Sequence, residues 1–152
     1  MMMSYLRFDS ARFLKNSKSW DDELKKLRDA LDSITEIGGA SDEPGRSSEI
    51  SRPTERTSLD RMAIEGRISI LEIYKAALKY CMKKLSAYDR ELIEGFFYNS
   101  GSIQIFVELW CKEHDYTNRT YCYRDRRTAL EHFADAAEEY MRMIGYDVPT
   151  HN

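Results

Sequence analysis

The chain has 152 residues, 42% hydrophobic and 32% charged, with a net charge of -3 at pH 7. This length suits a single domain with a buried core, and the acidic balance excludes a protein that coats nucleic acid through its overall charge. Three cysteines without a CxxC spacing indicate neither a disulfide framework nor a zinc ribbon. The sequence contains no run of about 18 apolar residues and no signal-peptide pattern, so we expect a cytoplasmic protein that does not enter a membrane.

The first 85 residues are predicted to form an N-terminal helical region. Residues 1–19 interleave basic and aromatic side chains, which fits a short amphipathic helix, a docking arm or a flexible basic arm. After Ser19, large apolar residues recur at steps of four and three, as in a narrow helix-packing seam. These residues are Trp20, Leu24, Leu27, Leu31 and Ile34. Such a seam requires a partner helix, either in this chain or in a second copy.

A mobile linker is expected at about residues 38–58. Gly38 and Gly39 are expected to end the preceding helix, and the stretch up to Ser58 is rich in Gly, Ser, Pro and charge. A second long helix is predicted from Ser58 to about Leu85. Its buried face would hold Ile70, Tyr74, Ala77, Leu78, Cys81 and Leu85. Together the two helices would form a helical hairpin or half of a dimeric coiled coil.

Residues 86–147 are predicted to form a helix-turn-helix DNA-binding domain. Ser86 begins a helix whose buried side is Leu92, Ile93, Phe96 and Phe97. The next helix runs from Ser102 to about His114, with Ile103, Phe106, Val107 and Trp110 along one face. Asp115, Tyr116 and Thr117 leave room only for a tight turn, and Thr117 or Asn118 is the N-cap of a last helix that ends at Gly145.

The start of this last helix is the one strongly basic segment of the C-terminal half. Residues 118–130 contain four arginines and one acid, Asp125, which gives a local charge of +3. The flanking segments 86–117 and 131–152 each carry a charge of -4. A polyanion would therefore meet one positive helix on a repelling background. A basic second helix after a short turn is typical of a DNA recognition helix, although packed helix pairs with a solvated basic face are common.

Catalytic motifs are missing from the sequence. It has no glycine-rich phosphate loop, no HExxH and no GxSxG, so we do not expect an enzyme. Cys111, His114, Cys122 and His132 form the only group that suggests a metal site, and their spacing is not that of a zinc finger. We therefore expect structural thiols, no metal and no cofactor.

Two segments resemble a known group: LSAYDRELIEGFFYN and NRTYCYRDRRTALEHFAD. They resemble the phage-encoded transcription activators of the RinA/ArpU type, whose C-terminal domain is similar to region four of bacterial sigma factors. The resemblance implies that Thr117 to Arg127 opens the recognition helix, with Asn118, Arg119 and Thr120 at the end that enters the DNA. The turn of the group usually carries a glycine and a small apolar residue where this chain has Asp115 and Tyr116.

The sequence thus predicts an all-α protein that regulates phage or prophage transcription. We expect an N-terminal helical hairpin or coiled coil, followed by a sigma region-four-like helix-turn-helix. The expected partners are double-stranded DNA, RNA polymerase and a second copy of the chain. Arg119 is expected to read a base, while Arg126 and Arg127 hold phosphates; which of Cys122, Tyr123 and Arg124 faces the groove stays open. The candidate DNA-binding residues are Thr117, Asn118, Arg119, Thr120, Tyr123, Arg124, Arg126 and Arg127. The alternative is a small helical phage-encoded inhibitor or adaptor that binds a host protein.

Overall fold

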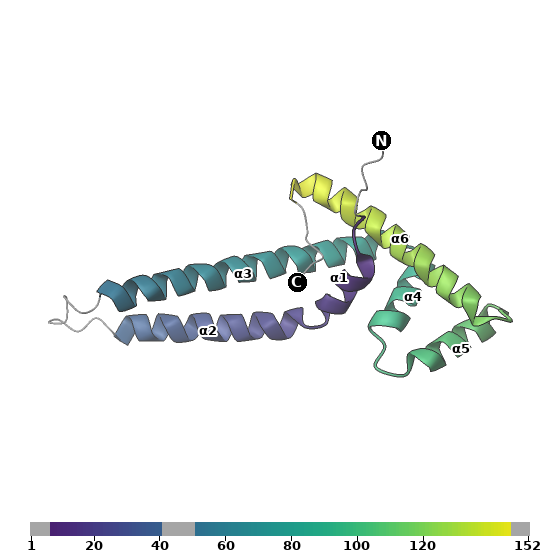
Figure 1. Cartoon of the computed structure of the whole chain (residues 1–152), viewed down its shortest axis with the longest axis horizontal. Helices are drawn as coiled ribbons and strands as arrows, with labels where there is room; N and C mark the ends of the chain where they lie inside the picture. Colours follow the sequence, from purple (N-terminus) through teal and green to yellow (C-terminus); the bar gives the residue numbers. More distant parts are fainter. Residues whose placement is uncertain (1–6, 41–50, 147–152) are drawn as a thin grey trace. The chain divides into compact units, whose positions relative to one another are not determined.

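The computed structural model describes residues 7–40 and 51–146, which form six α-helices and no strand (Figure 1). The predicted all-α class is therefore confirmed. The chain divides into two compact units: residues Ser19–Lys75 form one, and the residues up to Lys18 together with those from Ala76 onward form the other. Among the described residues, no helix has both the length and the apolar character needed to cross a membrane.

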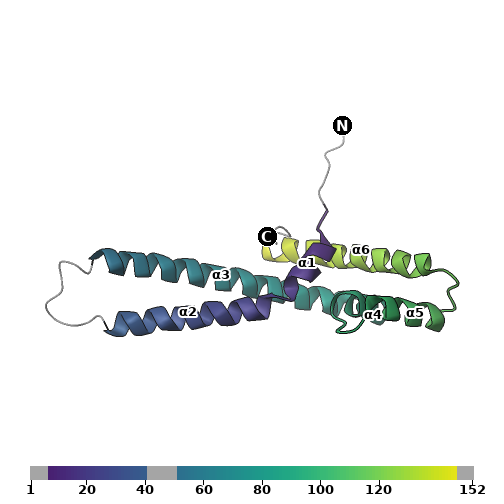
Figure 2. The ribbon, with the colours of Figure 1, turned by 60° about the horizontal axis from the view of Figure 1, so that its bottom comes forward.

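The unit Ser19–Lys75 consists of α2 (Trp20–Ala40) and most of α3 (Ser51–Lys84). The two helices run side by side in both Figure 1 and Figure 2. Trp20 and Leu24 are buried and the ring of Trp20 lies 5.5 Å from that of Tyr74, so this end of the predicted seam is confirmed. Farther along α2, Leu27, Leu31 and Ile34 are only half-buried.

Three ion pairs flank this seam. Arg67 Nε lies 2.7 Å from a carboxylate oxygen of Glu23, and the pair is partly shielded from solvent. The more exposed pairs are Lys75 with Asp21 at 2.6 Å and Arg28 with Glu72 at 3.2 Å. Because residues early in α2 pair with residues late in this part of α3, the two helices are antiparallel. Exposed ion pairs contribute about 0–1 kcal/mol each, so the apolar seam does most of the stabilising.

The helix boundaries differ from the prediction on both sides of the expected linker. The helix α2 continues through Gly38 and Gly39 to Ala40, and α3 begins at Ser51 instead of Ser58. Pro53 is the third residue of α3 and lies in its first turn, where a proline is tolerated because its missing N–H would have no helical partner. The remaining part of the expected linker, residues 41–50, lies outside the described residues.

The other unit consists of α1 (Ser10–Ser17), the end of α3, α4 (Ala87–Phe97), α5 (Ile103–Glu113) and α6 (Arg119–Ile144). Its core is built from aromatic and small side chains on these helices. The fully buried or nearly buried members are Phe13, Leu14, Cys81, Leu85, Leu92, Ile93, Phe96, Phe97, Val107, Trp110, Cys122, Ala129, Phe133, Ala134 and Ala137. The predicted buried faces of α3 and α4 are therefore largely confirmed.

The inclusion of α1 in this unit differs from the predicted boundary between residues 85 and 86. Phe13 and Leu14 are buried, and the Phe13 ring lies 5.9 Å from that of Phe133 on α6. At the end of α1, Ser17 Oγ lies 2.6 Å from the hydroxyl of Tyr98, which follows α4. The sequence left open whether residues 1–19 form a helix or an arm; the structure shows a packed amphipathic helix over residues 10–17.

Side-chain caps explain where the last three helices begin, and the caps predicted at Ser86, Asn118 and Gly145 are confirmed. The side chains of Ser86 and Ser102 accept hydrogen bonds from the backbone N–H groups of Asp89 and Ile105, at the starts of α4 and α5. Asn118 does the same for Thr120 at the start of α6. Gly145 ends α6 with φ 64°, in the left-handed region that glycine adopts without strain.

Candidate nucleic-acid interface

The candidate interface is formed by α5, the turn His114–Asn118 and the first half of α6. The turn is closed by a hydrogen bond from the N–H of Tyr116 to the carbonyl of Cys111, 2.8 Å long. His114 stacks on Trp110 with ring centres 4.1 Å apart, and its Nδ1 lies 2.9 Å from the Trp110 carbonyl oxygen. These contacts fix the direction in which α6 leaves α5.

One predicted member of the buried face of α5 is on the surface. Val107 and Trp110 are buried and Phe106 is half-buried, as the spacing predicted, but Ile103 is 46% exposed. The face of α5 that packs on α6 is completed instead by Cys111, which is buried. Ile103 is the first residue of the helix, where it lies beyond the end of the core.

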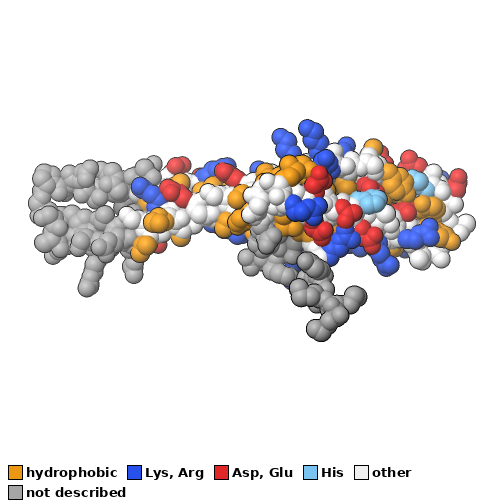
Figure 3. Space-filling model, turned by 90° about the horizontal axis from the view of Figure 1, so that it is seen from above, with side chains coloured by type: hydrophobic (Ala, Val, Ile, Leu, Met, Phe, Trp, Pro, Cys, Tyr) orange, Lys and Arg blue, Asp and Glu red, His pale blue; other side chains and the backbone are white. Residues whose placement is uncertain are grey.

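The first half of α6 has a clear inner and outer side. Cys122 and Ala129 are fully buried, which excludes Cys122 from any groove. Of the three residues among which the sequence could not decide, Tyr123 and Arg124 are exposed and can reach a ligand. The outer side also holds Thr120, Arg127 and Thr128. On the face of the molecule seen in Figure 3, acidic and basic side chains are interspersed.

The one acid in this stretch, Asp125, is turned toward the core. Its Oδ2 accepts hydrogen bonds from the hydroxyls of Tyr88 on α4 and Tyr116 in the turn, at 2.6 and 2.8 Å, and from Trp110 Nε1 on α5 at 3.3 Å. Partial burial disfavours the charged carboxylate, but the hydrogen bonds from Tyr88, Tyr116 and Trp110 outweigh burial and lower the pKa of Asp125. These three hydrogen bonds hold the carboxylate against α4, α5 and the turn, and so fix the rotation of α6 about its axis.

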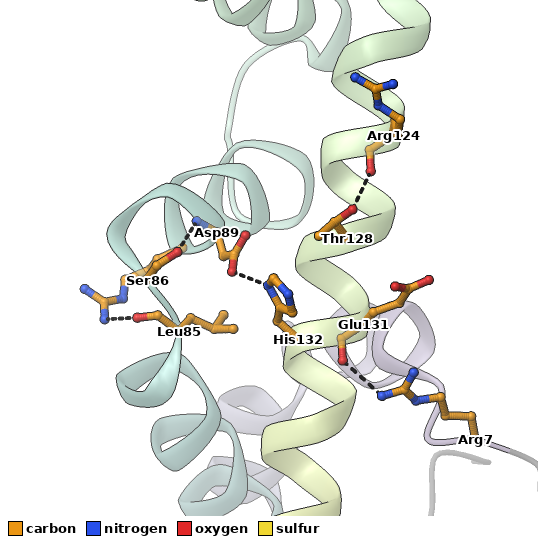
Figure 4. A network of polar contacts seen from close by, with 9 residues as sticks. Arg7, Leu85, Ser86, Asp89, Arg124, Thr128, Glu131 and His132 are labelled. Carbon is orange, nitrogen blue, oxygen red and sulfur yellow. Dashed lines mark hydrogen bonds and ion pairs between the residues drawn. The ribbon is translucent and has the colours of Figure 1, made fainter.

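A second polar contact fixes α6 on α4 about two turns farther along. The carboxylate of Asp89 is buried, and its Oδ2 lies 2.6 Å from Nδ1 of His132 (Figure 4). Ser86 Oγ accepts the N–H of Asp89 and so holds the carboxylate at the start of α4. Asp125 and Asp89 thus attach two successive parts of α6 to the same helix.

Arg126 lies on the inner side, in contrast to the sequence expectation that it holds a phosphate. Its guanidinium carbon lies 5.2 Å from the ring centre of Phe96 and 5.4 Å from that of Phe97. Cation–π contacts of this kind contribute about 0.5–2 kcal/mol. The half-buried Arg126 is accordingly placed to stabilise the contact between α6 and α4.

The other three arginines are exposed, with different neighbours. Arg119 pairs with Glu108 of α5 at 2.9 Å, and each side chain is 54% exposed. The guanidinium of Arg124 lies 4.7 Å from the ring centre of Tyr121. Arg127 forms no ion pair within residues 7–40 and 51–146. The sequence did not predict the role of Glu108, because nothing in the spacing of α5 indicates which acid lies beside the start of α6.

The remaining candidate residues surround the start of α6. Thr117 is exposed, and the hydroxyl of Thr120 donates to the side-chain oxygen of Asn118 at 2.9 Å. An open surface depression of about 270 Å³ lies here, between α5 and the first turn of α6. It is lined by Glu108, Cys111, Lys112, Tyr116, Thr117, Asn118 and Arg119. Backbone N–H groups and positive charge at a helix start favour an anion such as a phosphate.

Neither a metal centre nor a known relative accounts for this surface. Within the described ranges, no three His, Cys, Asp or Glu side chains lie together as a metal site would require. Comparisons of the chain with protein-family models, with curated proteins and with solved structures found no match.

Proposed function

We propose that this protein is a sequence-specific double-stranded DNA-binding transcription regulator in which α4, α5 and α6 act as a helix-turn-helix domain. The observation that carries the proposal is the division of charge on α6: Arg119, Arg124 and Arg127 are exposed, while Asp125 is bound inside the unit. DNA approaching this side would meet three exposed guanidinium groups, whereas the one carboxylate of the first half of α6 is half-buried and hydrogen-bonded to Tyr88 and Tyr116. A recognition helix in the major groove presents its start to base edges in this way.

Arg119 is the candidate base reader because it lies in the first turn of α6. Its pairing with Glu108 does not oppose this role, since an exposed ion pair is worth about 0–1 kcal/mol, whereas a bidentate contact to guanine is worth about 1–3 kcal/mol. Arg119→Ala should therefore relax sequence preference. Glu108→Gln should strengthen DNA binding, because it removes both the competing partner and a negative charge.

Arg124 and Arg127 are the candidate phosphate contacts, with Tyr123 and Thr120 on the same outer side. Arg126 is left out of the contact set because its guanidinium lies on Phe96 and Phe97. A phosphate contact adds affinity without sequence information. Arg127→Gln should thus weaken binding to all duplexes alike and reduce the slope of log K against log salt by about 0.9.

The chain offers a matched control for this variant. Arg142 lies on the same helix, is exposed like Arg127 and changes the net charge equally when replaced by Gln. Fluorescence anisotropy with labelled duplexes at several salt concentrations should show a reduced slope for Arg127→Gln and an unchanged slope for Arg142→Gln. If the wild-type protein binds no duplex even at low salt, the DNA-binding proposal fails.

The N-terminal helices support a regulator that acts with further partners. We propose that α2 and α3 form a hairpin whose half-buried residues, Leu27, Leu31 and Ile34, pack against a second copy of the chain. A dimer would place two recognition helices on half-sites about one helical turn of DNA apart. The resemblance to phage activators favours phage or prophage genes as targets and RNA polymerase as a partner. Sequencing of genomic fragments retained by wild type and by Arg127→Gln would identify the operator.

A protein-binding adaptor is the second candidate. It is favoured by two large apolar side chains one turn apart on the surface of α5, Ile105 at 57% and Leu109 at 60% exposure. Contiguous exposed apolar residues commonly mark protein contacts. In this case Ile105→Ser/Leu109→Ser would abolish binding of a host protein, and changes at Arg127 would have no effect.

A further inference from the structure

The segment Arg7–Lys18 is held against α6 directly after its basic half. Ser10 Oγ donates to the carbonyl of Leu130 at 2.8 Å, and Phe13 packs on Phe133. Leu130 follows Arg127 by three residues, or about 4.5 Å along a helix that rises about 1.5 Å per residue. Any polyanion that lies along the outer side of α6 at Arg127 therefore passes close to α1.

Beyond Thr128, the outer side of α6 becomes acidic, and Arg7 covers this acidic part. Its guanidinium is paired with the carboxylate of Asp135 and lies 3.6 Å from a carboxylate oxygen of Glu138. It also donates to the carbonyl of Glu131 at 3.3 Å (Figure 4). Without Arg7, these carboxylates would repel a nucleic acid bound at Arg124 and Arg127. The contact thus extends the region of α6 along which a polyanion is tolerated.

The outward side of α1 is basic. Arg12, Lys15 and Lys18 recur every third residue and are exposed, whereas residues 10–18 contain no acid. Within the described residues, Lys15 and Lys18 form no ion pair, so their charges are not neutralised by the protein.

The position of this charge also fits a helix-turn-helix bound to DNA. The contact of Ser17 with the hydroxyl of Tyr98 holds the end of α1 beside the segment that leads into α5. In helix-turn-helix domains the first helix of the motif crosses the DNA backbone. Basic side chains next to the start of α5 would therefore lie near phosphates and not near base edges.

We propose that Arg7–Lys18 is a second DNA-contacting surface: Lys15 and Lys18 bind backbone phosphates, and Arg7 neutralises the acidic continuation of α6. This inference rests on the proposed function and extends it, because it assigns DNA contact to a segment outside the helix-turn-helix. Contacts to phosphate strengthen binding to any sequence.

The first test compares two double variants of the full chain, Lys15→Gln/Lys18→Gln and Lys25→Gln/Lys26→Gln. All four lysines are exposed, and each variant removes two positive charges, but Lys25 and Lys26 lie on α2. With duplexes of about 20 base pairs, the α1 variant should lower the salt slope by about 0.9 per lost phosphate contact and leave sequence preference unchanged, while the α2 variant keeps the wild-type slope.

The outcomes separate this inference from the function on which it rests. If wild type and all variants fail to bind DNA, both proposals fall. If Arg127→Gln weakens binding but the α1 and α2 double variants behave alike, the helix-turn-helix proposal stands and the second surface is refuted.

A second test addresses Arg7. Arg7→Gln should weaken binding at low salt by about twofold for each phosphate within about 10 Å of the unneutralised carboxylates. Adding Asp135→Asn/Glu138→Gln should restore the affinity, because the repelling charges are then absent. Circular dichroism verifies that each variant keeps its helix content. Failure of the added substitutions to restore binding, in a folded protein, would overturn the neutralising role.

Discussion

The carboxylate of Asp125 joins three parts of the C-terminal unit, so Asp125→Ala should measure how strongly α6 is held. The substitution removes hydrogen bonds from Tyr88, Tyr116 and Trp110, of which Trp110 is buried. A hydrogen bond to a charged group contributes about 1.5–3 kcal/mol, and an unsatisfied buried donor costs about 1–3 kcal/mol. Because the carboxylate and both tyrosines are partly exposed, water replaces part of these bonds, and we expect a loss of about 2–3 kcal/mol in the free energy of unfolding.

Urea unfolding followed by tryptophan fluorescence can measure this loss. The chain has two tryptophans, and a Trp20→Phe background leaves Trp110 as the only reporter, inside the unit of interest. Tyr88→Phe keeps the ring and removes one donor, so it should cost about 1 kcal/mol alone and almost nothing when added to Asp125→Ala. Fully additive losses, or a loss below about 0.5 kcal/mol for Asp125→Ala, would refute the shared network.

The same network predicts that the free energy of unfolding falls at both acidic and alkaline pH. The pKa of Asp125 is lowered from its usual 3.8, so its contribution to stability is present above that value and is lost as the pH falls through the still lower folded pKa. Burial, and then the hydrogen bond to Asp125, raise the pKa of Tyr88 above its usual 10.0, so its contribution is lost as the pH rises above 10.0. Asp125→Ala should remove the loss of stability that Asp125 causes at acidic pH and reduce the loss that Tyr88 causes at alkaline pH. An unchanged difference between wild type and variant at pH 3 and pH 7 would contradict this account.

Three further predictions follow from packing and burial. A methyl group on Gly95 would meet the Phe106 ring at 2.1 Å, so Gly95→Ala should lower the melting temperature through overpacking worth about 1–3 kcal/mol. Gly66→Ala, whose methyl group meets nothing within 4 Å, should raise the melting temperature. Similar shifts for both variants would count against the close contact of α4 and α5. Burial raises the pKa of Cys122 to about 11, so this thiol should react with a disulfide reagent at pH 8 only after denaturant is added, and rapid labelling of the native protein would be the opposite result. Sedimentation should show a wild-type dimer at roughly tens of micromolar and a monomer for Leu27→Asp, and a monomeric wild type would leave only the intramolecular hairpin.

Local signals explain why much of the helical framework could be predicted. Ser86, Ser102 and Asn118 satisfy backbone N–H groups only a few residues away, and Gly145 ends α6 through its own backbone. Such interactions depend on neighbours in the sequence, so the sequence alone indicates them. The same holds for the buried face of α4, where the helical period places apolar residues on one side.

Interactions over long sequence separations could not be predicted in this way. The sequence showed that Asp125 is the one acid among four arginines but not that Tyr88, 37 residues away, binds it. The inward position of Arg126 depends on where Phe96 and Phe97 lie, although its neighbour Arg127 is exposed. Likewise α1 belongs with α6 because Ser10 contacts Leu130, 120 residues farther along the chain. These contacts determine which side of α6 is exposed.

The turn between α5 and α6 contains a residue other than glycine in the left-handed region of backbone conformation. Asp115 has φ 55°, in the left-handed region that glycine adopts most readily. The N–H of Tyr116 bonds to the carbonyl of Cys111, and the N–H of Tyr146 bonds in the same way to Met141 after Gly145, which has φ 64°. The two helices therefore end in the same motif, once with aspartate and once with glycine. Aspartate is one of the few other residues that tolerate the left-handed region, so the chain makes a short turn between α5 and α6 without a glycine.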